Sequence, residues 1–281
     1  TLGSASTELK LTDANTALSL SGIALETGPG SLTLSGALTM SGNSKLNSSG
    51  GTITLGSGGS ASSGTEISLP DTTLVLQNAL SLTGATLKTK NTTLTTNDKA
   101  LSLSSSSILE VDGTQDLSGI VPDSTSTLTL RLAADATINY STALSVETLD
   151  LANFALTLDD NMAGLSVSQA LTLDAATEQI ITGDTDLSLN GGITVSNGTL
   201  SSTGGALSAS SFNVGTTGTV DIQGGTLTLP AGGTAVSGAA FTTSGATINL
   251  ADSLVVEDAW TITNTSISLT GEASLSHSSA V

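Results

Sequence analysis

Small apolar and polar residues alternate along most of this chain in short runs. Segments 31–34 (SLTL), 52–55 (TITL) and 226–229 (TLTL) place Leu or Ile at every second position. Because successive side chains of a strand point to opposite faces, this pattern predicts short β-strands with the aliphatic residues inward and Ser or Thr outward. A helix would need apolar residues at steps of three and four, and Gly, Ser and Thr interrupt every stretch that could supply them. We therefore expect an all-β fold.

The apolar triplets recur on three interleaved tracks, each with a step of about 21 residues, which is typical of a repeat array. The first track runs through Leu25, Leu46, Ile67, Leu87, Ile108, Leu128, Leu149, Leu171, Ile193 and Phe212. The second runs through Leu165, Leu187, Leu207, Leu227, Ile248 and Ile267. The third runs through Leu11, Leu32, Ile53, Leu74 and Leu94, and resumes as Leu200, Val220, Phe241 and Trp260.

Three short strands per coil predict a three-sided parallel β-solenoid, elongated, with about 20–21 residues per coil and roughly 13–14 coils. We expect its structural core to contain Leu25, Leu46, Ile67, Leu87, Ile108, Leu187, Leu207, Leu227, Ile248, Ile267, Phe241 and Trp260. Phe241 and Trp260 lie 19 residues apart on one track. They are therefore expected to stack in neighbouring coils and fill the core.

The repeat runs through the chain without a charged or proline-rich linker, so we expect residues 1–281 to form a single solenoid domain. The phase is least secure near 56–65, 110–127 and 159–164, where we expect loops or irregular coils. Leu9 and Leu275 already belong to the repeat, and no cap is visible before or after them. Either the ends pair with neighbouring copies, or the chain is a segment of a longer repetitive protein.

Composition decides between a folded solenoid and a disordered Ser/Thr-rich chain. Charged residues make up only 11% of the chain, its mean hydropathy is +0.26, and the apolar positions stay in phase over many coils. A disordered linker has no reason to keep such a phase. The aromatic content of 2% suits a narrow core of stacked aliphatic side chains.

The charge balance excludes one class of partner and favours an extracellular location. Twenty-four acids against six bases give a net charge of -18, and no basic patch could neutralise the phosphates of a nucleic acid. The sequence has no Cys, and no apolar run is long enough to predict a membrane span. We expect a secreted protein of the cell surface, kept soluble by its acids.

Candidate catalytic groups are few, and we do not expect an enzyme or a bound cofactor. The only histidine, His277, lies in a polar segment, where a Ser-His-Asp triad would need a nucleophile close to the imidazole. Asp159 with Asp160, or Asp112 with Asp116, could act as an acid and base pair. Adjacent strand residues point to opposite faces, however, which argues against the first pair.

Bound calcium is the alternative to a chain without a cofactor, because alternate carboxylates on turns match the preference of Ca²⁺ for oxygen ligands. The candidates are Asp112 and Asp116 in the segment DGTQD, and Asp184 and Asp186 in the segment GDTD. Neither segment matches the nonapeptide calcium repeat, in which paired glycines precede the acid. We therefore favour turn acids without a metal.

Two surface patterns suggest further roles. An outward column of Thr resembles the Thr-x-Thr face of ice-binding β-solenoids, although Val75 interrupts it; its members are Thr52, Thr54, Thr73, Thr93 and Thr95. β-Propensity alone is the competing explanation. Lys88, Lys90 and Lys99 gather half of the basic charge and could pair with acids of an adjacent coil or protomer.

Repeats such as 51–55 (GTITL) and 225–229 (GTLTL) resemble the β-strand repeats of large bacterial autotransporter passengers and filamentous-haemagglutinin-like adhesins. That resemblance implies a right-handed parallel β-helix that is exported and serves in adhesion, aggregation or biofilm matrix. We accordingly expect an extracellular structural or adhesive solenoid, acting as a surface stalk or as a filament formed by head-to-tail stacking. Its expected partners are further copies of itself, as a homopolymer, or host and surface glycans. A ligand-binding solenoid for ice or glycan is the alternative, followed by a carbohydrate-active β-helix enzyme.

Overall fold

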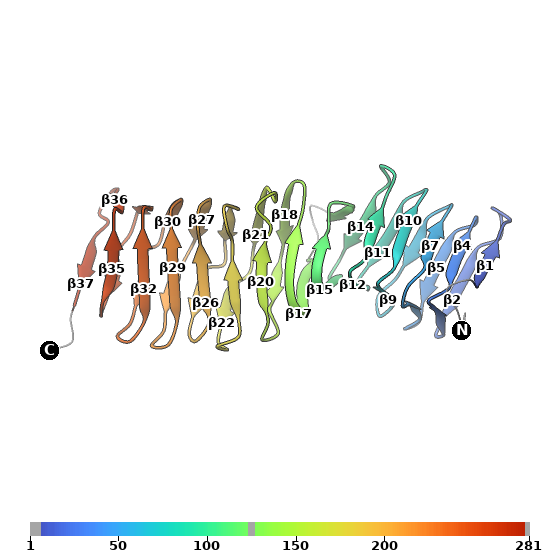
Figure 1. The fold of residues 1–281 in the computed structure, drawn as a ribbon, viewed down its shortest axis with the longest axis horizontal. Helices are drawn as coiled ribbons and strands as arrows, with labels where there is room; N and C mark the ends of the chain where they lie inside the picture. Colours follow the sequence, from blue (N-terminus) through green and yellow to red (C-terminus); the bar gives the residue numbers. More distant parts are fainter. Residues whose placement is uncertain (1–6, 123–126, 279–281) are drawn as a thin grey trace. The chain divides into compact units, whose positions relative to one another are not determined.

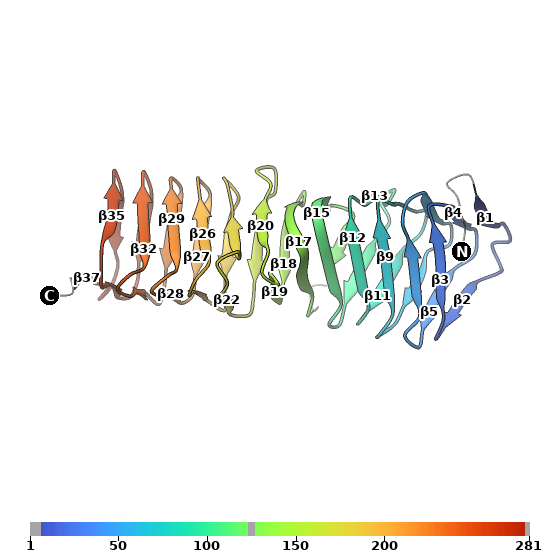
Figure 2. The same ribbon diagram turned by 60° about the horizontal axis from the view of Figure 1, so that its bottom comes forward.

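The computed structural model describes residues 7–122 and 127–278, and these residues form β-strands and turns without a helix. The chain divides into two compact units, residues 1–136 and 137–281. In each unit parallel strands stack in successive coils, as Figures 1 and 2 show. The two units together hold about 13 turns of β-solenoid, which confirms the predicted fold class. That residues 1–281 form one domain stays a prediction.

The first unit has three faces, and each turn contributes one strand to each face. One face contains β1 (Glu8–Leu11), β4 (Ser31–Leu34), β7 (Thr52–Leu55), β10 (Thr73–Leu76) and β13 (Thr93–Thr95). The second contains β2 (Leu18–Ser21), β5 (Leu38–Ser41), β8 (Gly59–Ala61), β11 (Leu80–Thr83), β14 (Leu101–Ser104) and β16 (Ile120–Pro122). The third contains β3 (Ala24–Gly28), β6 (Lys45–Ser48), β9 (Glu66–Pro70), β12 (Thr86–Lys90) and β15 (Ile108–Asp116), followed by β17 (Thr129–Asn139), which crosses the division between the units.

The second unit is built in the same way. One face contains β18 (Ala143–Val146), β21 (Gly164–Val167), β24 (Leu187–Leu189), β27 (Ala206–Ala209), β30 (Thr226–Leu229), β33 (Thr247–Leu250) and β36 (Ser266–Leu269). Another contains β22 (Leu171–Leu173), β25 (Ile193–Val195), β28 (Phe212–Val214), β31 (Gly233–Ala235), β34 (Leu254–Val256) and β37 (Leu275–His277). The third contains β20 (Ala155–Leu158), β23 (Gln179–Ile181), β26 (Thr199–Ser202), β29 (Thr219–Gln223), β32 (Ala240–Ser244) and β35 (Trp260–Thr263), while the short β19 (Thr148–Asp150) pairs with β17.

Columns of aliphatic side chains fill each unit. Leu207, Leu227 and Ile248 lie in register on β27, β30 and β33 and are at most 2% exposed. Burying each such side chain contributes roughly 1.5–3 kcal/mol relative to leaving it in water. The predicted core positions that are fully buried are Leu46, Ile67, Leu87, Leu187, Leu207, Leu227, Ile248 and Phe241.

The other four predicted core positions are only half-buried. Three of them, Leu25, Ile267 and Trp260, lie on strands that end their sheets among the described residues, so only one neighbouring coil covers them. Ile108 is different, because its strand is displaced by one residue. The register pairs Leu87 with Leu109, and Leu109 takes the buried position. Since a shift of one residue exchanges the faces of a strand, Ile108 leaves the core column.

The first and third sequence tracks do not connect as predicted. In the second unit, the first-track residues Leu171, Ile193 and Phe212 lie on β22, β25 and β28. The strand that enters this unit, β17, instead precedes β20 in the sheet that contains β26, β29, β32 and β35. In the second unit, this sheet is therefore formed by the residues assigned to the later part of the third track, and not by those of the first track. Near the start of the chain, Leu9 rather than Leu11 pairs with Leu32.

The three stretches expected to be irregular differ from one another. The first, 56–65, contains the regular strand β8, whose small Ala61 occupies the core column next to Met40. Across 110–127, β15 continues to Asp116 and β16 follows, whereas residues 123–126 lie outside the described part. The third, 159–164, is a turn in which the Met162 amide donates to the Asp159 carbonyl, at 2.8 Å.

Candidate functional site

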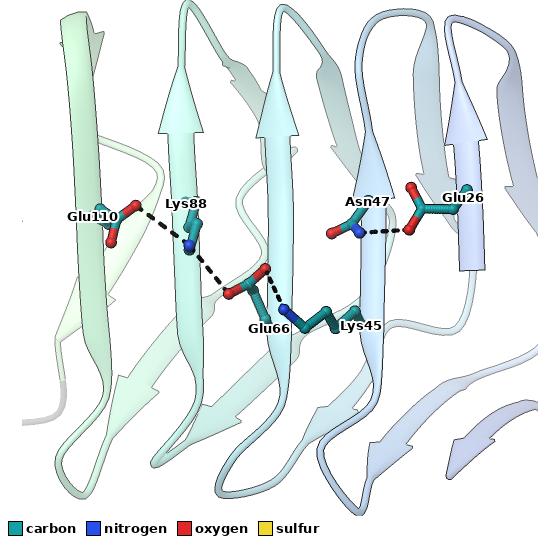
Figure 3. A network of polar contacts seen from close by, with 6 residues as sticks. All are labelled: Glu26, Lys45, Asn47, Glu66, Lys88 and Glu110. Carbon is teal, nitrogen blue, oxygen red and sulfur yellow. Dashed lines mark hydrogen bonds and ion pairs between the residues drawn. The ribbon is translucent and has the colours of Figure 1, made fainter. Parts of the chain in front are cut away.

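A row of alternating charges crosses the outward face of β6, β9, β12 and β15. Lys45 Nζ lies 3.4 Å from Glu66 Oε1, and Lys88 Nζ lies 3.1 Å from Glu66 Oε2 and 3.5 Å from Glu110 Oε1. Figure 3 shows Glu66 between the two lysines, with the Asn47 amide donating to Glu26 alongside. We call Lys45, Glu66, Lys88 and Glu110 the charge ladder. It forms because strand pairing brings residues about 21 positions apart onto adjacent coils.

A second pair lies beside the ladder and lines a shallow hollow of about 160 Å³. Lys90 Nζ lies 2.8 Å from Asp112 Oδ2. The hollow is lined by Ser68, Pro70, Lys88, Thr89, Lys90, Glu110, Asp112 and Ala133. Both lysines in this lining have acidic partners, so the hollow offers a neutral surface rather than a cation or anion site. The prediction that Lys88 and Lys90 pair with acids of an adjacent coil is confirmed.

The ladder sets the pKa of its central lysine. Burial works to lower the pKa of Lys88, but the hydrogen bond to Glu66 and the charges of Glu110 and Glu66 outweigh it and raise the pKa above 10.5. The hydrogen bond and charge of Asp112 likewise raise the pKa of Lys90. A lysine whose pKa is raised by folding stabilises the fold below its ordinary pKa of 10.5. That contribution is lost as the pH rises through the folded-state value.

Replacing Lys88 with Met tests how much the ladder contributes. Each exposed ion pair contributes about 0.2–1 kcal/mol, so we expect K88M to lower the free energy of unfolding by about 1 kcal/mol. Salt screens such pairs, so the difference from wild type is expected to shrink between 10 mM and 1 M NaCl in urea titrations. Lys99→Met is the control, because Lys99 is exposed and has no ion pair among the described residues. Equal effects of both variants at low salt would contradict the ladder's contribution.

The calcium candidates do not come together. Asp112 is bound to Lys90, and Asp116 Oδ1 accepts the Ser118 amide at 3.0 Å. Asp186 Oδ1 accepts the Ala206 amide at 2.7 Å, while Asp184 is exposed at the preceding corner. Within residues 7–122 and 127–278, no group of three or more His, Asp or Glu side chains is arranged to hold a metal ion.

The candidate acid and base groups are engaged in turns. Asp159 Oδ1 accepts the amide of Asn161 at 2.9 Å, and its pKa is lowered by the backbone and side-chain hydrogen bonds from Asn161. Asp160 Oδ1 accepts the Asp184 amide at 3.3 Å. His277 Nε2 lies 3.0 Å from the carbonyl oxygen of Asp258. Each of these groups therefore stabilises a corner locally.

Glu178 is a buried acid that the sequence did not reveal. It is 7% exposed, and its Oε2 accepts the amides of Asp174 and Ala175 at 2.7 and 3.2 Å. Its Oε1 accepts the amide of Asn153, a residue of the preceding coil with a φ of 73°. Backbone amides thus replace the water molecules that the carboxylate loses on burial. Glu178 fixes two successive corners of the second unit, and no spacing in the sequence distinguishes it from other corner acids.

Three aromatic rings lie next to one another in the second unit, and two of them are stacked. The Phe241 and Trp260 rings are 4.9 Å apart and nearly parallel, at 10°, and Phe212 lies 5.7 Å from Phe241. The Trp260 indole nitrogen donates to Thr243 Oγ1 at 3.1 Å. Stacking of Phe241 on Trp260 in neighbouring coils is as predicted. The rings contact each other and the core, which leaves them as packing groups rather than as a platform for sugar.

Comparisons with protein-family models, curated proteins and solved structures gave no match for this chain. Among the described residues there is also no helix long and apolar enough to cross a membrane.

Proposed function

We propose that this chain is an extracellular structural or adhesive solenoid, serving as a surface stalk or as the subunit of a filament. The observation that carries the proposal is the in-register strand pairing on every face of each unit. Coil after coil repeats the same aliphatic interior and the same outward Ser and Thr. Such an array gains length by adding coils and acts through its shape and surfaces.

The resemblance in style to exported bacterial adhesins supports the extracellular location.

The distribution of charge supports separate rods over lateral clumps. All six basic residues lie before residue 132, whereas residues 137–281 contain 13 acids and no Lys or Arg. Lateral contact between copies through the second unit would bring like charges together, which disfavours side-by-side clumping.

The last described coil supports association at the end of the second unit. Leu269 pairs in register with Leu250 and Ile262 with Thr243, so both side chains belong to core columns. Leu250 and Thr243 are at most 1% exposed, whereas Leu269 and Ile262 are 50% and 45% exposed. A further parallel coil would cover them and pair with the edge strands. We propose that the first coil of a second copy does so, which gives a head-to-tail, heterologous contact.

Trp260 offers a direct measurement, because it is the only tryptophan and lies half-buried in this coil. As protein concentration rises, we expect its emission to shift to the blue, while electron microscopy shows lengthening filaments. Leu269→Lys is expected to abolish both effects, because a charge would lie in the new core. Thr261→Lys, at an exposed position of β35 in register with Thr242, is the matched control. Unchanged emission and single short particles at all concentrations would contradict the proposed filament and would leave the surface stalk as the proposed role.

A further inference from the structure

His277 occupies a core column of the second unit, although it is a polar residue. The register of β31, β34 and β37 aligns Ala235, Val256 and His277, and the first two are each 1% exposed. Because residues paired in register point to the same face, His277 belongs to the inward column of β37. Its side chain is exposed, since β37 is the last strand of its sheet among the described residues (Figure 1). A further coil on this end would therefore cover an imidazole.

The hydrogen bonding of His277 suits a neutral ring. Its Nε2 lies 3.0 Å from the carbonyl oxygen of Asp258, and a carbonyl oxygen only accepts, so Nε2 carries the hydrogen. The neutral ring then has no hydrogen on Nδ1. Protonation adds one there, and no hydrogen bond joins Nδ1 to the residues that the structure describes. Covering the charged ring would bury a cation with an unpaired donor, which is costly.

The Asp258 carboxylate is held by its own corner. Its oxygens accept hydrogen bonds from Ser237, Gly238 and Ala259. The backbone hydrogen bond from Ala259 lowers the pKa of Asp258 below 3.8, followed by the hydrogen bonds from Gly238 and Ser237 and by the charge of His277. Asp258 therefore stays ionised between pH 5 and 8. The strands β34, β35 and β36 contain no charged residue, and the other acids on the segments around them are Asp252, Glu257 and Glu272.

The first coil of a second copy has no inward charge that could pair with an imidazolium. The inward residues of β1 and β2, in register with core positions of β4 and β5, are Leu9, Leu11, Leu18 and Leu20. Glu8 and Lys10 point outward and lie 3.4 Å apart. Glu26, on β3, points outward and accepts from the Asn47 amide at 2.6 Å. Asp13, in the turn after β1, accepts from the Asn15 amide and the Thr16 hydroxyl.

We propose that pH controls head-to-tail association through His277, because a second copy can cover the neutral imidazole but not the imidazolium. The inference rests on the proposed function, since it needs a second copy on the last described coil. Histidine ordinarily changes its charge between pH 5 and 8, and burial disfavours the charged form. Association of a copy with a charged ring must therefore release a proton, so association is strong at pH 8 and weakens as the pH falls.

Sedimentation velocity of the full chain over a range of concentrations, at pH 8 and pH 5, tests the proposal. We expect the wild-type chain to need a concentration about tenfold higher or more for half-association at pH 5. His277→Leu is expected to associate equally at both pH values. His277→Gln should do the same, because its amide can donate to the Asp258 carbonyl without becoming charged. The acids of the chain act in the opposite direction, since a lower pH reduces the repulsion between copies.

A double variant, His277→Leu with Ser276→His, is the matched control. It moves the imidazole by one residue to an exposed, outward position in register with Val255. The ring then stays in contact with water after association, so we expect no weakening at pH 5. Circular dichroism at both pH values verifies that the strands of each variant remain.

The possible failures of the inference and of the filament differ. Equal association of the wild-type chain at pH 5 and pH 8 would overturn the role of His277 and leave the filament. The same weakening at pH 5 in His277→Leu would also overturn that role, because another group would then be responsible. If neither the wild-type chain nor His277→Leu associates at either pH, the filament is overturned and this inference with it.

Discussion

Replacing Leu227 with Asp is expected to unfold the coils around β30. Leu227 is fully buried, and its neighbours in the column are Leu207 and Ile248, which are at most 2% exposed. Neither of those two side chains carries a cation or a hydrogen-bond donor that could compensate a carboxylate. The lost apolar contact and the buried charge together are expected to cost about 4 kcal/mol or more.

Thr228→Asp is the matched control for this prediction, because it adds the same charge one residue along the same strand. Thr228 points outward and pairs with Ser208 and Asn249. We expect this variant to change the free energy of unfolding by about 0.5 kcal/mol or less. Thermal melting followed by circular dichroism measures both variants. Equal melting of Leu227→Asp and wild type would contradict the inward assignment of the second track.

The pH dependence gives this experiment a second readout. Desolvation raises the pKa of a carboxyl buried at position 227 above its unfolded value of about 3.9. The destabilisation from the charge is therefore largest at neutral pH and diminishes as the pH falls towards that value. Thr228→Asp should show no such recovery, because its carboxyl remains in contact with water.

Alternation and spacing were sufficient to predict the strands, their inward faces and the solenoid. They succeed because the period of two determines which side chains are buried. In-register stacking then places the same positions inward in every coil. The predicted second track, from Leu165 to Ile267, lies in register on one face from β21 to β36, although the prediction lacked Leu144 on β18, which pairs with Leu165. Its coils are regular enough that spacing alone defines the register.

Spacing fails where a coil gains a residue. Ser105 and Ser106 both have positive φ values, 49° and 60°, at the corner before β15. The step from Leu87 to the buried Leu109 is consequently one residue longer than the assumed 21. Farther on, the long β17 and the extra β19 make one coil irregular. Because the tracks have similar steps, the residues after this coil were assigned to the first and third tracks the wrong way round. A period cannot reveal which of three similar faces a strand joins.

The charge ladder was partly visible in the sequence. Lys45 and Glu66 each precede an inward residue of the first track, which places them in one outward column, one coil apart. The pairing of Glu178 with backbone amides was not visible, because it depends on the corner conformation at Asn153 rather than on any repeated position. A pattern of side chains cannot predict a site that is formed by the backbone of an irregular corner.

Replacing Gly225 with Ala is expected to disrupt a corner of the second unit. Gly225 has a φ of 63°, and a Cβ there would lie 2.1 Å from the carbonyl oxygen of Gly205 in the preceding coil. That carbonyl also accepts the Thr226 amide at 2.9 Å, so it cannot move away without breaking the ladder. Left-handed backbone costs roughly 1–2 kcal/mol for alanine, and the clash adds about 1–3 kcal/mol.

Gly245→Ala separates these two costs. Gly245 has nearly the same φ, 65°, but a Cβ there would meet nothing within 4 Å. We expect Gly245→Ala to be destabilised only by the left-handed backbone. The free energies of unfolding of the two variants, measured in urea, should therefore differ by about 1–3 kcal/mol. Hydrogen exchange should locate the extra loss at the amides of Thr226 and Thr247, which donate to the carbonyls of Gly205 and Gly225. Equal losses in both variants would mean that adjacent coils can separate at a corner, and glycine would then be required there for its backbone conformation alone.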